Sequence, residues 1–203
     1  IFIPRDSFIL CRYQDKSIAW DKDRSLKEAV QYWLEMISPQ VKLDVSEIEN
    51  TDLAKLGFYY MDNTKSRIFR QTNVGFGISY VLPIIVALLK AEYGSILVLE
   101  NPEAHLHPKG QRKMGELIAQ CAANGIQIFL ETHSDHILNG IRIAVKQKVL
   151  KGEDTKLFYF TRKESKGKMV HIAECPEIYD NGKLSYWPDG FFDEWEKALD
   201  EIL

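Results

Sequence analysis

The sequence predicts an α/β fold in which a mostly parallel sheet is flanked by helices. Continuous apolar runs at 95–99, 126–130 and 156–160 have the length and composition of buried parallel strands. Helical segments at 108–124 and 134–148 separate them, and strands that alternate with helices are typical of parallel α/β sheets. Ligands in such sheets bind just beyond the carboxyl ends of the strands, so the residues that follow these runs are the first candidates for a functional site.

Before the first of these strands we expect a helix, a hairpin and a second helix. Ser25 begins a capping box, and the apolar residues behind it recur at helical spacing: Leu26, Ala29, Val30, Trp33, Leu34 and Ile37. Two short strands, 58–61 and 67–71, flank a turn-rich segment. The second helix is predicted over about residues 79–92, with Pro83 near its start, where backbone N–H groups have no partner within the helix.

After residue 160 the pattern changes. Strands are expected at 169–173 and 184–187, the latter after the Asn181-Gly182 turn. Residues 191–203 form an acidic amphipathic pattern that predicts a closing helix.

The composition is that of a globular protein with a sizeable core. The 203 residues are 45% hydrophobic and 27% charged, and the net charge of −3 gives no overall attraction to nucleic acid. Cys11, Cys121 and Cys175 are far apart and form no CxxC pair, so we expect neither disulfides nor a zinc ribbon, and a reducing cytoplasm. The longest apolar run, 81–89, is too short to span a bilayer, and no membrane partner is expected.

Two strand ends carry acids and histidines. The first reads ENPEAHLHP over 100–108, and the second reads ETHSDH over 131–136. A carboxylate at the tip of a buried strand is rigidly held and can bind Mg²⁺ directly or through water. A histidine on the adjacent strand end can reach a terminal phosphate or an attacking water. Ser134 and Asp135 are equally well explained as caps of the following helix.

A third candidate is the loop GFGIS at 75–79. Gly75 and Gly77 let a backbone approach a ligand closely, and Ser79 is expected at a helix N-terminus, where anions bind. Most such loops are only turns, so its importance rests on its place about twenty residues before the first acidic strand end.

This order of loop, acidic strand end and histidine strand end resembles ABC-type ATPase heads, above all the prokaryotic branch that includes OLD-family, RecF and SMC proteins. A closer resemblance is to bacterial AAA/ABC-like ATPases with an uncharacterised C-terminal domain, several of which sit in defence-type gene neighbourhoods. It rests on five strings and covers about residues 70–195: VGFGIS (74–79), LPI (82–84), ENPEAHLHP (100–108), ETHS (131–134) and WPDGFF (187–192).

The resemblance implies a P-loop NTPase of ABC-head type that uses ATP and Mg²⁺. Glu100 matches the Walker B carboxylate, which binds Mg²⁺ through water, and His133 matches the switch histidine, which senses the γ-phosphate. Residues 104–108 match the D-loop at a dimer interface. Asn101 and His105 are expected to contact nucleotide.

The signature loop of the family matches Ser79 with the Gly75 and Gly77 backbone. In that family the signature of one subunit closes over ATP held by the P-loop of the other. The resemblance thus implies a homodimer or higher oligomer.

The chain departs from the family pattern in three places. No GxxxxGK[ST] motif is present, because Lys16 follows Asp15 and Lys65 follows Thr64. Three possibilities stay open: the P-loop precedes Ile1, where no initiator Met stands, it comes from another chain, or it does not exist.

The other two departures lie in the site. Asn101 stands where the catalytic glutamate is usual and cannot act as a general base, so Glu103 is the expected substitute that polarises water. Tyr80 stands where Gln or Glu is usual in the signature.

We expect three regions: a partial N-terminal, helical region (1–72), the signature, Walker B and His-loop core (73–162), and a C-terminal hairpin and helix (163–203). The expected function is an ATPase that dimerises around MgATP and gates a partner or effector, with anti-phage defence as the expected setting.

Two alternatives stay open. One is a degenerate, nucleotide-gated scaffold with little turnover. The other is a metal-dependent hydrolase or nuclease that uses His105, His107, His133 and His136 with the nearby acids. Basic stretches at 142–151 and 162–168 could contact nucleic acid, although a solvated face explains them as well.

Overall fold

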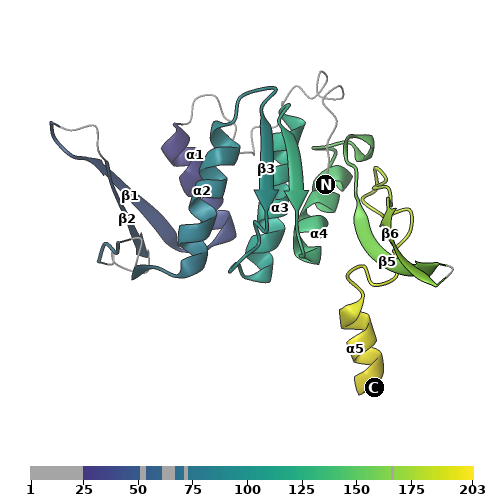
Figure 1. Cartoon of the computed structure of the whole chain (residues 1–203). Helices are drawn as coiled ribbons and strands as arrows, with labels where there is room; N and C mark the ends of the chain where they lie inside the picture. The colour runs from purple at the N-terminus through teal and green to yellow at the C-terminus, as the bar shows by residue number, and fades with distance from the viewer. Residues whose placement is uncertain (1–24, 51–53, 61–66, 71–72, 166) are drawn as a thin grey trace.

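A computed structural model describes residues 25–50, 54–60, 67–70, 73–165 and 167–203. Figure 1 shows how the elements of these residues are arranged. In chain order they are α1 (Leu26–Ile37), β1 (Val41–Glu47), β2 (Ala54–Tyr60), α2 (Phe76–Lys90), β3 (Ile96–Glu100), α3 (Pro108–Ala123), β4 (Gln127–Glu131), α4 (Asp135–Lys146), a short 3₁₀ helix (Gly152–Asp154), β5 (Tyr159–Ser165), β6 (Lys168–Glu174) and α5 (Glu194–Ile202).

The centre of the fold is the parallel pair of β3 and β4. Their register runs from Ile96 opposite Gln127 to Glu100 opposite Glu131, which confirms the predicted parallel pairing. Helices α2, α3 and α4 lie beside this pair (Figure 1). The core is formed by the buried faces of these helices, with Leu117 of α3 completely buried.

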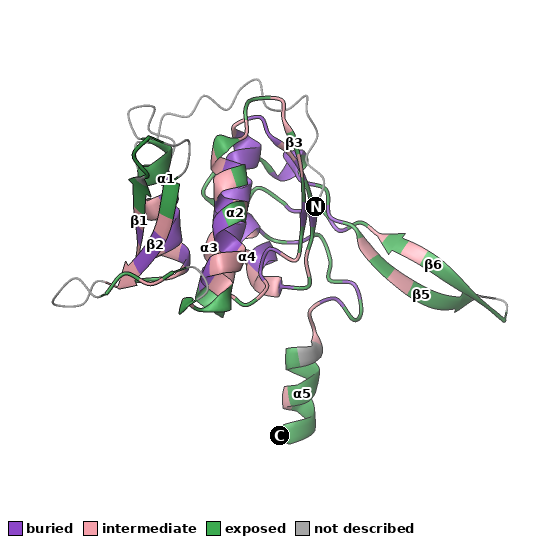
Figure 2. Ribbon diagram, turned by 60° about the vertical axis from the view of Figure 1, so that its left-hand side comes forward, coloured by how far each residue is buried: buried purple, intermediate pink, exposed green. Residues whose placement is uncertain are grey.

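Only one face of β3 is covered within the described residues. Leu99 is buried, whereas Ile96 and Val98 are 61% and 77% exposed. Figure 2 colours the described residues by burial class. The prediction of a strand buried on both faces was therefore wrong for this part of the chain. The reason is that successive side chains of a strand point to opposite faces, and the helices pack against one of them.

The predicted third parallel strand at 156–160 was wrong. Strand β5 begins only at Tyr159 and pairs antiparallel with β6, from Tyr159 opposite Glu174 to Ser165 opposite Lys168. The predicted strand at 169–173 is confirmed as β6, while 184–187 contributes only the bridge of Leu184 to Ile178.

The predicted hairpin of 58–61 with 67–71 was also wrong. Strand β2 pairs along its whole length with β1, a strand that the sequence analysis missed. Segment 67–70 adds a single bridge, in which Phe58 and Phe69 exchange backbone hydrogen bonds of 2.9 and 2.7 Å. The predicted turn at 62–65 lies outside the described residues.

The start of α1 agrees with the prediction, whereas α2 and α5 begin at other residues than predicted. The capping box of α1 is present, since the Ser25 side chain and Glu28 each accept a backbone N–H of the other. Helix α2 begins three residues before its predicted start, so that Pro83 lies in its interior and not in its first turn. Helix α5 begins only at Glu194, because Phe192 has a φ value of 57°, in the left-handed region that a right-handed helix excludes.

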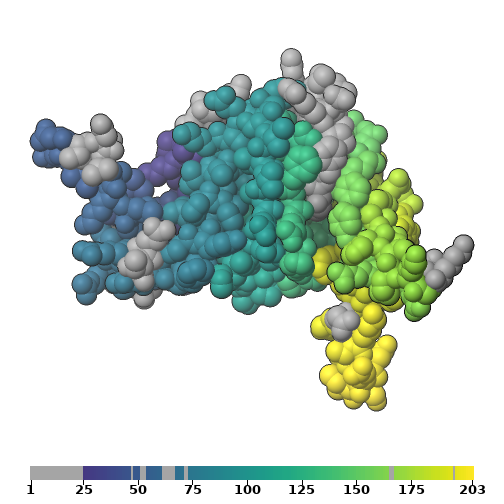
Figure 3. All heavy atoms as spheres, in the orientation of Figure 1, coloured from purple at the N-terminus to yellow at the C-terminus, as the bar shows by residue number. Residues whose placement is uncertain are grey.

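Arg142 fastens the segment after β6 to α4. Its Nε donates to the Gly182 carbonyl (2.7 Å), its Nη1 donates to Asn139 (2.8 Å), and its guanidinium lies 5.3 Å from the Trp187 ring centroid. Partial burial lowers the pKa of Arg142. Helix α5, in contrast, extends away from the rest of the described chain (Figure 3).

Two cysteines fall within the described residues, and both are free thiols, while Cys11 falls outside them. Cys121 is buried, and this burial raises the pKa of its thiol. None of the described helices combines the length and the apolar character needed to cross a membrane.

Helices α3 and α4 touch at two glycines. A Cβ atom on Gly115 would lie 2.2 Å from the carbonyl oxygen of Ile137, and one on Gly140 would lie 2.2 Å from that of Arg112. Backbone atoms cannot yield as a flexible side chain can, so both positions need glycine.

We expect Gly115→Ala to lower the free energy of unfolding by about 1–3 kcal/mol, the usual cost of an overpacked contact. Urea denaturation monitored by circular dichroism measures the change. Lys109→Ala, at an exposed position of the same helix, is the matched control and should change the free energy by less than about 0.5 kcal/mol. Equal stability of the two variants would show that α3 and α4 are not in close contact at Gly115.

Candidate functional site

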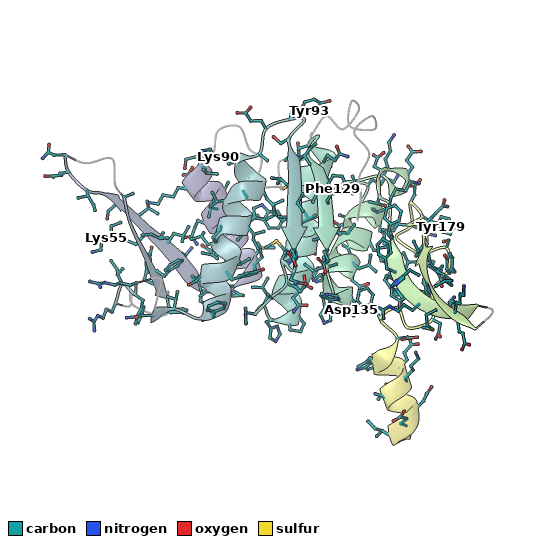
Figure 4. All side chains as sticks on the ribbon, viewed as in Figure 1. Lys55, Lys90, Tyr93, Phe129, Asp135 and Tyr179 are labelled. Carbon is teal, nitrogen blue, oxygen red and sulfur yellow. The ribbon has the colours of Figure 1, made fainter. Side chains whose placement is uncertain are left out.

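The predicted site residues meet at the carboxyl ends of β3 and β4. Glu100 and Glu131 are register partners, and the Asn101 N–H donates to the Glu131 carbonyl (3.1 Å), which extends the pairing by one residue. Helices α2 and α4 begin at the same edge of the sheet, where Figure 4 labels Asp135. The structure thus brings both polar strand ends and the loop at 75–79 to one edge.

The side chains at the two strand tips are open to solvent. The His133 side chain is 79% exposed, and its Nε2 lies 3.6 Å from a carboxylate oxygen of Glu131, which is itself 59% exposed. An ion pair this exposed contributes little stability. The imidazole can therefore leave Glu131 for a ligand at low cost. Glu131 was not among the predicted site residues.

The turn after β3 is tight. Asn101 and His105 have φ values of 46° and 62°, in the left-handed region that Asn and His enter more readily than most residues. The Ala104 N–H donates to the Asn101 carbonyl, and the Leu106 N–H donates to the Glu103 carbonyl, both at 3.0 Å. This turn carries Glu103 inward.

Glu103 is one of the few buried charged residues in the described chain, with 9% of its surface exposed. Its Oε1 accepts the backbone N–H of His133 at 2.8 Å, across thirty residues of sequence. Its Oε2 is buried and has no hydrogen-bond partner among the described residues. The carboxylate therefore connects the turn after β3 with the loop after β4.

A second side chain makes a parallel connection. The Ser134 hydroxyl donates to Oε1 of Gln111 (2.6 Å), and the Gln111 amide donates to the Leu106 carbonyl (2.9 Å). Ser134 also caps α4 by accepting the Ile137 N–H, as predicted. Gln111 was not predicted. Its place in the first turn of α3, where a side chain points back toward the preceding loop, was the available signal.

The loop at 75–79 is mostly helix. Gly75 is the N-cap of α2 and provides no side-chain cap, whereas Gly77 and Ser79 lie within the first turn and a half. A Cβ on Gly77 would lie 2.5 Å from the His105 carbonyl oxygen. Gly77 therefore permits close packing of α2 on the turn after β3. The Phe76 ring, 67% exposed, meets His105 edge-on at 4.6 Å.

Tyr80 contacts the same turn. Its hydroxyl lies 3.3 Å from both the Glu100 and the Asn101 carbonyl oxygens, to either of which it can donate. The unusual residue in the signature-like loop thus supports the end of β3.

A cavity of about 870 Å³ borders the strand ends. Its polar side is formed by Glu100, Glu131, Thr132 and His133. The remaining wall is largely apolar and comes from β3, β4, the segment around β5 and the residues before α5. Mostly apolar pockets with a few convergent polar groups are typical of ligand sites.

The histidines do not form a metal cluster. Across the described parts of the chain, no three His, Cys, Asp or Glu side chains gather as metal ligands. His107 instead caps α3 by accepting the Lys109 N–H (3.4 Å), and His136 lies 3.6 Å from Asp135. The geometry thus gives no support to the metal-hydrolase alternative.

Some residues of the basic stretches at 142–151 and 162–168 make contacts within the fold. Arg142 binds Gly182 and Trp187, and Lys163 pairs with Glu174 at 2.8 Å. Lys166 lies outside the described residues. Nucleic-acid binding stays a prediction.

The parallel strands β3 and β4 have acidic and histidine tips, and α2, with Gly75 as its N-cap, begins at the same edge. Comparison with known proteins identifies the chain as an ABC/AAA-like ATPase head. Residues 12–139, more than half of the chain, match the family model described as "AAA domain, putative AbiEii toxin, Type IV TA system". The chain belongs to this family. Residues 150–202 match a second model, described as "Protein of unknown function (DUF3696)". None of the curated proteins matches the chain.

Solved SMC ATPase structures share the fold. One, from work on ATP-driven dimerization and DNA stimulated activation of SMC ATPases, has a TM-score of 0.51 and 11% identity over 87% of this chain and 90% of that one. Another, an SMC head bound to the C-winged helix domain of ScpA, also has a TM-score of 0.51 and 11% identity, over 73% of this chain and 42% of that one. These likenesses establish the ABC-type P-loop NTPase fold.

The two glycines of the loop at 75–79 make a matched test of this packing. We expect Gly77→Ala to lower the free energy of unfolding by about 1–3 kcal/mol, because its Cβ would collide with the His105 carbonyl. Gly75→Ala, with nothing within 4 Å of the new Cβ, should cost less than about 1 kcal/mol. Chemical denaturation of both variants measures the difference, and a larger loss for Gly75→Ala would contradict the packing described here.

Proposed function

We propose that this chain forms the signature, Walker B and switch part of an ATPase head that closes with a second head around MgATP. The observation that carries the proposal is the convergence of Glu100, Asn101 and His133 with the start of α2 at one edge of the sheet. The P-loop comes from outside these 203 residues, which contain no GxxxxGK[ST] motif.

Glu100 is the residue that holds Mg²⁺, through water. Mg²⁺ is usually bound by one or two carboxylates together with waters and substrate phosphates, and an exposed carboxylate at a rigid strand end fits that donor set. When bound, Mg²⁺ neutralises the charge of the phosphates. His133 presents its exposed imidazole to the γ-phosphate from a backbone that Glu103 holds.

The start of α2 acts on the nucleotide of the opposing head. Gly75 leaves the first N–H groups of α2 without a side-chain cap, and such groups favour anions. Ser79, which is half buried at the start of α2, and the exposed His105 contact the same nucleotide in this proposal. Asn101 contacts the nucleotide from the tip of β3, and residues 104–108 contribute to the interface between heads.

A second candidate function is a nucleotide-gated scaffold that turns ATP over slowly. Asn101 cannot act as a base, and Glu103 is buried with one oxygen already bound to His133. Either function couples nucleotide to a partner or effector, with anti-phage defence as the setting. The SMC studies describe ATP-driven dimerization and a head bound to ScpA, which supports closure and partner binding here.

The first test uses the complete polypeptide together with whatever supplies its P-loop. We expect Glu100→Gln and His133→Ala each to reduce steady-state ATP turnover by roughly 100-fold, because each removes a group that stabilises the transferring phosphate. Glu177→Gln, an exposed carboxylate outside the site, is the control with the same chemical change and should keep its turnover.

Association measured with and without MgATP separates the two candidates. ATP-dependent dimers without turnover in the unaltered protein would favour the scaffold. If the protein neither binds ATP nor associates in its presence, both candidate functions are refuted.

A further inference from the structure

We propose that Glu103 is a positioning residue, whose carboxylate holds the loop after β4 so that His133 meets its ligand in one fixed backbone conformation. This departs from the prediction that Glu103 polarises the attacking water. The role of the loop in nucleotide sensing rests on the proposed function, whereas the contact between Glu103 and His133 does not.

The two carboxylate oxygens of Glu103 have different surroundings, one bonded to a backbone N–H and the other buried. Oε1 accepts the His133 N–H at 2.8 Å, and Oε2 is buried with no hydrogen-bond partner in the described parts of the chain. A general base must lie within hydrogen-bonding reach of the water that it deprotonates. One oxygen is occupied and the other is sealed from solvent, so Glu103 does not meet that requirement in this conformation.

The burial of Glu103 makes the hydrogen bond from the His133 N–H costly to lose. A buried carboxylate that lost this donor would have neither oxygen paired, which is costly in a poorly solvated site. The carboxylate and the His133 N–H therefore hold each other in place.

Ser134, the residue after His133, is also held by a side chain that follows β3. Ser134 donates to Gln111, and Gln111 in turn donates to Leu106 in the turn after β3. Two consecutive residues of the loop after β4 are thus fixed by side chains that follow β3. The His133 backbone is anchored while its ring stays 79% exposed, which is the arrangement that a phosphate sensor requires.

The contacts of Glu103 and Gln111 with the loop after β4 are linked to the signature-like loop at 75–79. The turn that carries Glu103 also carries His105, on which Gly77 and Phe76 of α2 pack. A displacement of the His133 backbone is therefore transmitted through Glu103 to the start of α2.

Hydrogen exchange at the His133 amide tests the proposal without any catalysis. We expect Glu103→Ala to accelerate this exchange by about tenfold, the effect of losing one hydrogen bond, and Glu103→Gln, which keeps an acceptor oxygen, to stay within about threefold of the unaltered protein. Glu131→Ala is the control, because Glu131 contacts the His133 ring and not its N–H. Unchanged exchange in Glu103→Ala, or equal acceleration in Glu103→Gln and Glu103→Ala, would overturn the proposal.

The amide of Leu117, in the buried centre of α3, reports whether the fold as a whole has loosened. If Glu103→Ala accelerates exchange there too, Glu103→Asp replaces it, since the shorter side chain keeps the charge but withdraws the acceptor. Acceleration at His133 without acceleration at Leu117 is again the expected result, and equal acceleration at both sites would overturn the proposal.

ATP turnover then separates positioning from base catalysis. A positioning role predicts that Glu103→Gln keeps turnover within a few-fold, with an unchanged pH profile, while Glu103→Ala loses most of it. Loss of turnover in Glu103→Gln with a protected His133 amide would identify Glu103 as the base and overturn the proposal. If the protein has no ATPase activity at all, the proposed function fails, and the exchange experiment still decides the role of Glu103.

Discussion

Two five-residue strands that run in the same direction place Glu100 beside Glu131, and every other contact of the candidate site starts from that juxtaposition. Because β3 and β4 are parallel, the turns that follow them leave the sheet at one edge, although thirty residues of sequence separate them. The side chain of Glu103 needs only to cross from one turn to the next to reach His133. An antiparallel pairing of the same strands would have sent these residues to opposite ends of the sheet.

The site combines hydrogen-bonded backbones with exposed side chains. Backbones are held by Tyr80 under the end of β3, by Glu103 at His133 and by Gln111 at Ser134. The side chains of Glu100 and His133, which we propose to face the ligand, are exposed, and both line the polar side of the cavity. A backbone that is already held in place lowers the entropic cost of binding, because only the side chains remain to be ordered by the ligand.

Much of the central fold follows from local sequence signals. Strands β3 and β4 and helices α3 and α4 were predicted because apolar runs, Pro108 and the Ser134 cap act within a few residues. The start of α2 was misplaced because Gly75 caps it without a side chain. Strand β1 was missed although Val41, Leu43 and Val45 alternate with polar residues. The hydrogen bond from the His133 N–H to Glu103 had no local signal in the sequence, because it forms only through tertiary packing.

The glycine contact between α3 and α4 has a mechanical consequence. Each helix begins where one of the two site loops ends, and at Gly115 and Gly140 their backbones touch with no side chain between them. Helices in such contact cannot slide along or rotate about one another without a steric collision. We therefore expect α3 and α4 to move together, so that a displacement of one site loop is passed to the other through the paired helices.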